Sequence, residues 1–373
     1  MASADEIAKI MNDAFGGNDE ESTVKSFLDT GYPELNHALS NGWGDEKKPA
    51  GLPVGRCVEI YGPESSGKTA IASEAMIAAQ KMGGFSGFND HERSFQQYLA
   101  ELNGLDTNPG RFSFKKPKTF EDSLTICVER SILLREKKLI AETAPICWVF
   151  DSLASMVPNS AYYEMKSGKV VGVKEAGARS MHDNTALARA TSAHFPAFAQ
   201  HCDDLGICAI FLNQIRMNIG VVYGNPETTP GGKAPKFYFS QRIALKAQKI
   251  SKGEGENAEV IGSQITAKVI KNKIARPFRT ATWRFEFQED GTGKFNVYRS
   301  MIDFLIQEGK LKKAGAYIEW TDGKKYFAGP LATKLEAEGK LGELKALLPA
   351  IYEPPVVAEL EVGELAPVEE KAA

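Results

Sequence analysis

Short apolar stretches alternate with longer segments in which apolar residues recur every three or four positions, from about residue 57 to residue 212. A continuous apolar stretch bounded by turn residues predicts a buried strand, whereas the longer spacing predicts a helix with one apolar face. The predicted strands cover 57–61, 84–89, 111–114, 145–150 and 206–212, and the predicted helices cover 68–82, 93–103, 120–137 and 184–201. Strands that alternate with helices favour the α/β class, with a mostly parallel central sheet covered by helices.

The pattern changes beyond residue 240. Residues 264–271 and 280–288 alternate polar and apolar side chains, which predicts antiparallel strands that extend the sheet. Residues 296–350 then predict a small α+β domain. Its expected elements are a helix at 297–308, strands at 316–320 and 325–328 joined by a turn at 322–323, and a helix at 330–348.

The first residues predict a short amphipathic helix. Ser3 and Glu6 have the spacing of a capping box, apolar residues follow at helical spacing, and two glycines end the pattern at 16–17. We expect that the apolar face either packs on its own domain or docks on a neighbouring subunit. The chain then divides into an N-terminal oligomerisation helix and linker at 1–30, a core at 31–285, a C-terminal α+β domain at 286–350, and an acidic, disordered tail at 351–373.

Composition places the chain among ordinary globular proteins, because 43% of its 373 residues are hydrophobic and 25% are charged. The net charge of −3 is unevenly spread: residues 211–249 hold six Lys or Arg and one Glu, while 351–373 hold six Glu and one Lys. The five cysteines lack C-x-x-C or metal-ligand spacing, so we expect buried free thiols in a reducing compartment. Without a signal peptide or an apolar stretch near the ~20 residues of a membrane span, we expect a cytoplasmic protein with no membrane partner.

One segment at residues 62–69 reads GPESSGKT and matches the P-loop pattern G-x-x-x-x-G-K-[ST]. It lies between a predicted strand and a predicted helix, which favours a phosphate-binding loop over an ordinary Gly/Ser turn. Backbone N–H groups would surround phosphate oxygens, Lys68 would contact the β- and γ-phosphates, and the Thr69 hydroxyl would ligate Mg²⁺. The expected nucleotide-binding residues are Gly62, Pro63, Glu64, Ser65, Ser66, Gly67, Lys68, Thr69 and Ala70.

Three further polar residues follow predicted strands. Asp151 ends an apolar strand and would hold Mg²⁺ directly or through water, although Asp at a strand end is common. Glu92 could polarise the water that attacks the γ-phosphate, or be a solvated loop carboxylate; the adjacent His91 is interpreted as incidental. Gln214 would lie near the γ-phosphate and sense it. The sequence therefore predicts ATP and Mg²⁺ as cofactors.

Four segments resemble the RecA family of bacterial DNA recombinases, in the order found in that family. They read GLPVGRCVEIYGPESSGKT at 51–69, NQIRMNIGVVYGNPETTPGGKAPKFY at 213–238, VIKNKIARPF at 269–278 and KAGAY at 313–317. The resemblance spans about residues 25–350 and implies a RecA-like P-loop ATPase core. It implies that Lys68, Thr69 and Asp151 are the P-loop and magnesium residues, that Glu92 activates water, and that Gln214 senses the γ-phosphate.

The resemblance also implies roles that the residues alone do not. Lys271 and Lys273 match a lysine pair that reaches the ATP of the neighbouring subunit, so that a filament would complete the active site. The expected DNA-binding residues are Arg189, Ser192, Arg216, Met217, Asn218, Ile219, Gly220, Val221, Tyr223, Gly231, Gly232 and Lys233. Cations would track the backbone of single-stranded DNA while an apolar side chain stacks on bases.

Several positions depart from the family pattern. Residues 158–188 are longer than the bacterial stretch, Pro196 stands where an Arg is expected, and an insert occupies 45–50. Tyr98 lies about one position from the usual adenine-stacking Tyr, which leaves the adenine contacts open. We interpret this divergence as that of a phage-encoded relative, between bacterial RecA and the phage UvsX type.

The leading hypothesis is an ATP-dependent homologous recombinase that forms helical filaments on single-stranded DNA, finds homologous duplex DNA and exchanges strands in recombination and repair. The lysines at 310, 312 and 313 could capture the duplex, and the acidic tail could either compete with DNA or only aid solubility. Single-strand-binding and mediator proteins are further expected partners, in a bacterial cytoplasm or a phage-infected host. The alternatives are a hexameric helicase with the same core and an ATP-gated scaffold filament.

Overall fold

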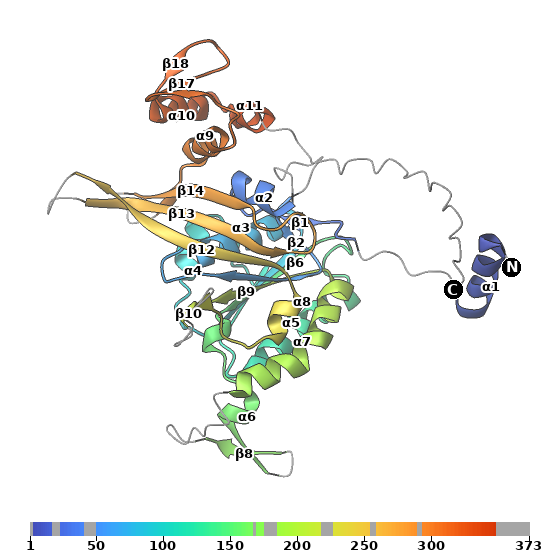
Figure 1. The fold of residues 1–373 in the computed structure, drawn as a ribbon. Helices are drawn as coiled ribbons and strands as arrows, with labels where there is room; N and C mark the ends of the chain where they lie inside the picture. The colour runs from blue at the N-terminus through green and yellow to red at the C-terminus, as the bar shows by residue number, and fades with distance from the viewer. Residues whose placement is uncertain are drawn as a thin grey trace, which may run out of the picture.

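The computed structural model describes residues 3–16, 23–40, 50–166, 169–174, 185–217, 227–253, 259–288 and 293–347. Its centre is a nine-stranded sheet with the strand order β15-β14-β13-β12-β3-β9-β6-β4-β5, with helices packed on its faces (Figure 1). This arrangement confirms the predicted α/β class with a mostly parallel central sheet. The predicted domain bounds stay a prediction, although the central sheet continues through its last strand at Phe295.

The parallel part of the sheet is built from the strands that the apolar stretches predicted. These are β3 (Cys57–Tyr61), β4 (Phe85–Asp90), β5 (Phe112–Lys115), β6 (Ile146–Asp151) and β9 (Ile207–Asn213). Every residue of β3, β4, β6 and β9 is buried, because helices cover both faces. Their carboxyl ends meet at one edge, where β3 leads into residues 62–69.

The covering helices divide the core into two layers. Helix α3 (Lys68–Lys81) packs on the face that carries Val58 and Ile60, whereas α5 (Phe120–Glu136) and α7 (Ala186–Leu205) pack on the face that carries Trp148. Alternate side chains of a strand point to opposite faces, so one strand serves both layers. Pro196 lies inside α7.

One predicted helix is shorter than expected. The spacing predicts a helix at 93–103, but α4 covers only Gln97–Leu102. The Asp90 carboxylate accepts hydrogen bonds from the backbone N–H groups of Arg93 at 2.6 Å and Ser94 at 3.3 Å, and Arg93 has a positive φ of 63°. These bonds hold residues 93–95 in a turn at the end of β4, so the helix begins later.

The antiparallel part of the sheet is longer than predicted. Strands β13 (Glu259–Asn272), β14 (Thr280–Phe287) and β15 (Gly293–Phe295) pair antiparallel, which confirms the expected antiparallel extension. Strand β12 (Phe239–Lys252) was not predicted, although it has 14 residues and joins the parallel part to β13. Only its first half is buried, and its exposed second half carries lysines that obscure the apolar pattern.

The C-terminal residues form a small α+β unit with its own apolar core. It contains α9 (Val297–Gln307), the three-stranded sheet of β16 (Lys313–Ala314), β17 (Tyr317–Glu319) and β18 (Lys325–Tyr326), then α10 (Ala328–Ala337) and α11 (Leu341–Ala346). The single helix predicted at 330–348 is wrong, because Gly339 takes a φ of 65° and separates α10 from α11. The strand predicted at 325–328 ends at Tyr326, since α10 begins at Ala328.

The N-terminal helix α1 (Ala4–Phe15) forms as predicted, with both hydrogen bonds of the capping box present. Its apolar face is uncovered: Ile7 is 52% exposed, Ile10 63% and Met11 51%. Figure 1 shows α1 apart from the sheet and helices. Between α1 and β3 lie β1 (Phe27–Leu28), α2 (Pro33–Ser40) and β2 (Leu52–Pro53).

The segment after β6 carries an additional hairpin in the extension noted at 158–188. A short 3₁₀ turn (Leu153–Ser155) and α6 (Asn159–Tyr162) lead into β7 (Tyr163–Lys166) and β8 (Lys169–Val173), which pair antiparallel. The remaining short elements are β10 (Arg216–Met217), β11 (Glu227–Thr228) and α8 (Ala234–Tyr238). Among the described residues, none of the helices could cross a membrane.

The cysteine residues confirm the expected buried thiols. Cys57, Cys127, Cys147, Cys202 and Cys208 are all buried and none forms a disulfide. The sulfur atoms of Cys57 and Cys202 lie 3.8 Å apart. Burial raises the pKa of the thiols of Cys127, Cys147, Cys202 and Cys208, which keeps them protonated at neutral pH.

Candidate nucleotide and DNA site

Residues 62–69 form a loop between β3 and α3, the position that the sequence predicted for them. Gly67 caps α3 with a φ of 85°, a conformation that favours glycine. At Gly62 a Cβ atom would lie 2.8 Å from the carbonyl oxygen of Leu245 and 2.7 Å from Ser66 Oγ, so only glycine fits. Because no side chain caps α3, its first N–H groups can bind an anion.

Lys68 bends over this loop. Its Nζ donates hydrogen bonds to the carbonyl oxygens of Gly62 at 3.1 Å and Pro63 at 2.7 Å. Burial lowers the pKa of Lys68, and the negative charges of Asp151, Glu92 and Glu64 act in the opposite direction. The ammonium therefore lies within the field of the carboxylates at the strand ends, where it can also meet phosphate oxygens.

Asp151 is held at the end of β6 with only 5% of its surface exposed. Burial, together with the negative charges of the nearby Glu92 and Asp90, raises its pKa to about 7, although the positive charge of Lys68 opposes this rise. A divalent cation beside Asp151 would stabilise the charged form of its carboxyl group. Asp151 and Thr69 line the same cavity, where their carboxylate and hydroxyl groups could hold Mg²⁺ together with phosphate oxygens. Among the described residues there is no group of three or more His, Cys, Asp or Glu side chains able to hold a metal ion.

Glu92 and Gln214 are joined directly, although they lie on different strand ends. Gln214 Nε2 donates a hydrogen bond to Glu92 Oε1 at 2.9 Å, and Ser152 Oγ donates to the same oxygen. The backbone N–H of Glu92 donates to the Asp151 carbonyl oxygen at 3.1 Å. The structure therefore brings together the three polar residues predicted at this edge. Ser152 was missed, although its place directly after Asp151 could have indicated it.

His91 contacts the helix behind β4. Its Nε2 lies 3.1 Å from Ser123 Oγ, and burial with the charge of Arg93 lowers its pKa to about 4. The ring is therefore neutral at pH 7, and it points toward α5. This geometry supports a structural role for His91 and leaves Glu92 as the candidate for activating water.

Aromatic side chains line the space beside the loop. Two adjoining cavities of about 410 and about 340 Å³ lie against Thr69 and Ala70, and both are also lined by Phe285, Phe287 and Phe295. Such a wall suits a flat apolar ring such as adenine. These phenylalanines were missed by sequence reasoning, whereas Tyr98 is 67% exposed and its neighbour Leu99 lines the larger cavity instead.

Two groups of the expected DNA-binding residues, at 189–192 and at 231–233, meet at the start of α7. Thr191 Oγ1 donates a hydrogen bond to the Gly231 carbonyl oxygen at 2.8 Å, and a Cβ at Gly232 would lie 2.8 Å from Ala188 Cβ. The turn at Gly231 and Gly232 is therefore packed against the helix that carries Arg189 and Ser192, and Lys233 follows it at the start of α8. The Ser192 hydroxyl donates to the Ala188 carbonyl oxygen at 2.8 Å within its own helix.

The segment between β9 and this turn is described only at its two ends. Arg216 is exposed on β10 and pairs with Thr228 of β11, and Met217 continues β10. The other predicted DNA contacts here, Asn218, Ile219, Gly220, Val221 and Tyr223, lie outside the described residues.

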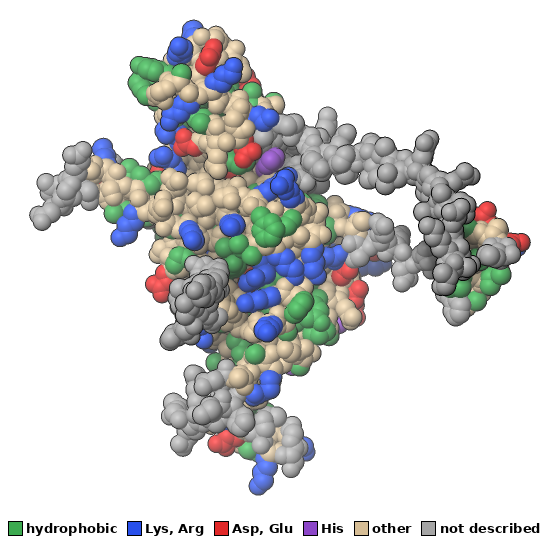
Figure 2. All heavy atoms as spheres, viewed as in Figure 1, with side chains coloured by type: hydrophobic (Ala, Val, Ile, Leu, Met, Phe, Trp, Pro, Cys, Tyr) green, Lys and Arg blue, Asp and Glu red, His purple; other side chains and the backbone are tan. Residues whose placement is uncertain are grey.

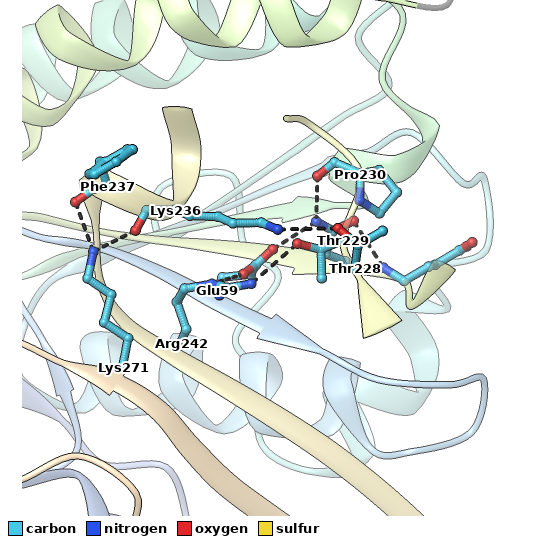
Figure 3. A network of polar contacts seen from close by, with 10 residues as sticks. Glu59, Thr228, Thr229, Pro230, Lys236, Phe237, Arg242 and Lys271 are labelled. Carbon is cyan, nitrogen blue, oxygen red and sulfur yellow. Dashed lines mark hydrogen bonds and ion pairs between the residues drawn. The ribbon is translucent and has the colours of Figure 1, made fainter. Parts of the chain in front are cut away.

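Lys271 and Lys273 lie at the end of β13, beside α8. Lys271 Nζ donates hydrogen bonds to the carbonyl oxygens of Lys236 at 2.5 Å and Phe237 at 2.9 Å (Figure 3). Burial, together with the positive charges of Lys273 and Arg242, lowers the pKa of Lys271 to about 8. Lys273 is exposed, and Figure 2 shows Lys and Arg side chains gathered on the visible face near α8. Within one chain Lys271 thus faces α8 and bonds its carbonyl groups.

Comparisons with known proteins place the chain beside proteins of one family. A family model described as the RecA N-terminal domain matches residues 14–291. The chain is 35% identical over 302 residues to Protein RecA of Lactococcus lactis subsp. cremoris strain MG1363, covering 80% of this chain and 68% of the relative. It is 36% identical over 297 residues to Protein RecA of Chloroherpeton thalassium, covering 80% and 72%. It is 38% identical over 307 residues to Protein RecA of Chlamydia trachomatis serovar L2, covering 82% and 75%.

Proposed function

Because this chain belongs to the RecA family, we propose that it is an ATP-dependent homologous recombinase that forms helical filaments on single-stranded DNA and exchanges strands with homologous duplex DNA. The observation that carries this proposal is the hydrogen bond between Gln214 and Glu92. This bond joins Glu92, whose carboxylate would act on water, to Gln214, which follows β9. The predicted DNA-binding residues begin two positions later, at Arg216. The proposed setting is a bacterial cytoplasm, and a phage-encoded origin stays a prediction.

The proposed chemistry is hydrolysis of ATP to ADP and phosphate. The N–H groups at the start of α3 and the Lys68 ammonium would bind the phosphates, and the cavity lined by Phe285, Phe287 and Phe295 would bind the base. Mg²⁺, held by Thr69 and Asp151, would neutralise charge on the phosphate oxygens. Glu92 would orient and polarise the attacking water, with its carboxylate fixed by Ser152 and Gln214.

Filament formation would use the uncovered face of α1. We expect that changing Ile7 and Ile10 together to Asp prevents assembly on DNA, because two charges would replace the apolar surface that docks on the next subunit. Sedimentation with single-stranded DNA and ATP measures this. Lys9→Asp is the matched control, since Lys9 lies on the opposite face of the same helix. Normal filaments from the double variant would contradict the docking.

The lysine pair is expected to act on the neighbouring subunit. Changing Lys271 and Lys273 together to Ala should lower DNA-stimulated hydrolysis by about a hundredfold or more, because two cations would be lost from the transferring phosphate. The rate is measured at saturating DNA and ATP. Lys268→Ala, an exposed lysine on the same strand, is the control and should keep the normal rate.

A mixing experiment tests whether these lysines act across the interface. Subunits that lack Lys68 would still offer Lys271 and Lys273 to a neighbour, whereas subunits without the lysine pair would still bind ATP. We expect that mixing the two inactive variants restores part of the hydrolysis. If the mixture stays as inactive as its components, the lysines do not complete the site of the adjacent subunit.

The proposed function is tested by ATP hydrolysis with and without single-stranded DNA, followed by electron microscopy of the same samples. Stimulation together with helical filaments supports the recombinase, and a strand-exchange assay then completes the test. Stimulation with closed rings would favour the helicase. Filaments that form without ATP turnover would favour the scaffold, and a strand-exchange assay with a slowly hydrolysed ATP analogue separates pairing from turnover.

A further inference from the structure

A charged side chain lies buried in the middle of the central sheet. Glu59 is the third residue of β3, and its surface is 0% exposed. Its Oε2 accepts a hydrogen bond from Arg242 Nε at 2.5 Å, and its Oε1 accepts one from Asn213 Nδ2 at 2.8 Å. Arg242 lies on β12 and Asn213 at the end of β9, so Glu59 joins the two strands that flank β3 (Figure 3).

A contribution to stability does not by itself explain why the ion pair of Glu59 and Arg242 is buried in the sheet. Removing two charges from water is costly, and apolar residues of similar size often give equal or greater stability at a buried position. The remaining positions of β3 are mostly apolar and equally buried. The contacts that the pair makes therefore indicate its role better than its burial does.

One end of the hydrogen-bond network around Glu59 reaches residues 228–233, which we call the DNA-binding segment. Arg242 Nη2 donates a hydrogen bond to Thr229 Oγ1 at 3.3 Å, and Asn213 Nδ2 donates to the Pro230 carbonyl oxygen at 3.1 Å. Both acceptors directly precede the turn at Gly231. Figure 3 shows Glu59 and Arg242 beside Thr228, Thr229 and Pro230. A displacement of this segment by bound DNA would act on Arg242 and Asn213 first.

The other end reaches the nucleotide site. Because Glu59 and Pro230 both accept from the Asn213 amide nitrogen, the Asn213 Oδ1 atom is turned to accept the backbone N–H of Gln214 at 3.0 Å. The Gln214 side chain in turn donates to Glu92 at 2.9 Å. In addition, the Arg242 guanidinium lies 5.1 Å from the centre of the Tyr61 ring, directly before the P-loop.

We propose that Glu59 and Arg242 are positioning residues through which DNA bound at residues 228–233 sets the Gln214 amide against Glu92 and thereby stimulates ATP hydrolysis. This inference rests on the proposed function, since it requires a DNA-stimulated ATPase. Neither residue lines the two cavities beside the P-loop. Their effect is exerted by holding Asn213 and Thr229 in one arrangement without DNA and transmitting their shift when DNA binds.

The test compares Glu59→Gln with Thr229→Val. Glu59→Gln keeps the shape of the side chain and an acceptor for Asn213 but removes the charge that fixes Arg242. Thr229→Val removes only the hydroxyl that Arg242 contacts and leaves both charges in place, so it remains informative if Glu59→Gln does not fold. For each variant the measured quantities are thermal stability, DNA affinity by fluorescence anisotropy, and hydrolysis rates without DNA and at saturating DNA.

We expect the ratio of the DNA-stimulated rate to the rate without DNA to fall by about tenfold in both variants, measured with the DNA site saturated. Asp203→Asn is the matched control, because it removes the Arg56–Asp203 ion pair of 2.6 Å at the opposite end of β3 and should keep the normal ratio. Normal stimulation in a folded Glu59→Gln or Thr229→Val protein would overturn the inference. So would a stimulation ratio that returns to normal once the DNA concentration is raised to saturation, because only DNA affinity would then have been lost.

The wild-type protein separates this inference from the proposed function. If the rate of ATP hydrolysis by the wild type does not rise with DNA, the proposed function fails. The proposed role of Glu59 and Arg242 then fails with it, because there is no stimulation for them to mediate. If the wild type is stimulated and the two variants are stimulated equally, only the role of Glu59 and Arg242 fails.

Discussion

Glu92→Gln is expected to slow ATP hydrolysis by about 10²–10⁴-fold while filaments still assemble on DNA. The amide has the shape of the carboxylate and can still accept the hydrogen bond from Gln214, so the strand ends keep their arrangement. It cannot carry the negative charge that polarises water. Single-turnover hydrolysis at saturating DNA measures the chemical step, and electron microscopy of the same sample measures assembly.

The control for this change is Glu142→Gln. Glu142 is an exposed carboxylate just before β6, at the opposite end of the strand from Asp151, and its replacement should leave the rate unchanged. A normal hydrolysis rate in Glu92→Gln would show that another group activates the water. Loss of filaments together with activity would indicate that Glu92 supports the nucleotide-bound conformation instead.

Lys68→Ala should remove detectable ATP hydrolysis and weaken ATP binding strongly. Lys68 is part of the loop, where its positive charge interacts with the negative charges of Asp151 and Glu92. The positive charge of Lys68 lowers the pKa of Asp151, so its loss favours the protonated form of the group that would bind Mg²⁺. Affinity is measured with a fluorescent ATP analogue, and the fold is checked by thermal unfolding.

Lys81→Ala is the matched control, because Lys81 is an exposed lysine at the far end of the same helix. It should bind and hydrolyse ATP normally. If Lys68→Ala keeps its DNA-stimulated hydrolysis, residues 62–69 are not the nucleotide site, and the proposed function falls with them.

The parallel sheet and the P-loop could be predicted because their signals are local. Strands such as β6 are apolar up to their last residue, and the loop pattern fixes its residue types within eight positions. The late start of α4 could not be predicted, because the Asp90 carboxylate binds backbone groups that compete with the helix. The division of the last helix depends on the positive φ of Gly339, which the surrounding helical pattern conceals.

The parts of the site that sequence reasoning missed all depend on contacts between distant segments. Phe285 and Phe295 alternate with polar residues and so predict only a sheet face, although that face lines the cavity beside a loop more than 200 residues earlier in the chain. Glu59 within β3 carried a signal that was not used, since a lone acid in an apolar strand needs a buried partner. Its partner, Arg242, lies on the strand that was not predicted.

The buried cysteines make this protein convenient for site-specific labelling. Because all five native thiols are buried, a maleimide dye should react slowly with the folded chain. A cysteine introduced at the exposed Arg216 or Tyr98 would then carry the dye without prior removal of the native thiols. A fluorophore at each position would report on DNA and nucleotide in one otherwise unmodified protein, and the order in which the two ligands arrive could be followed in real time.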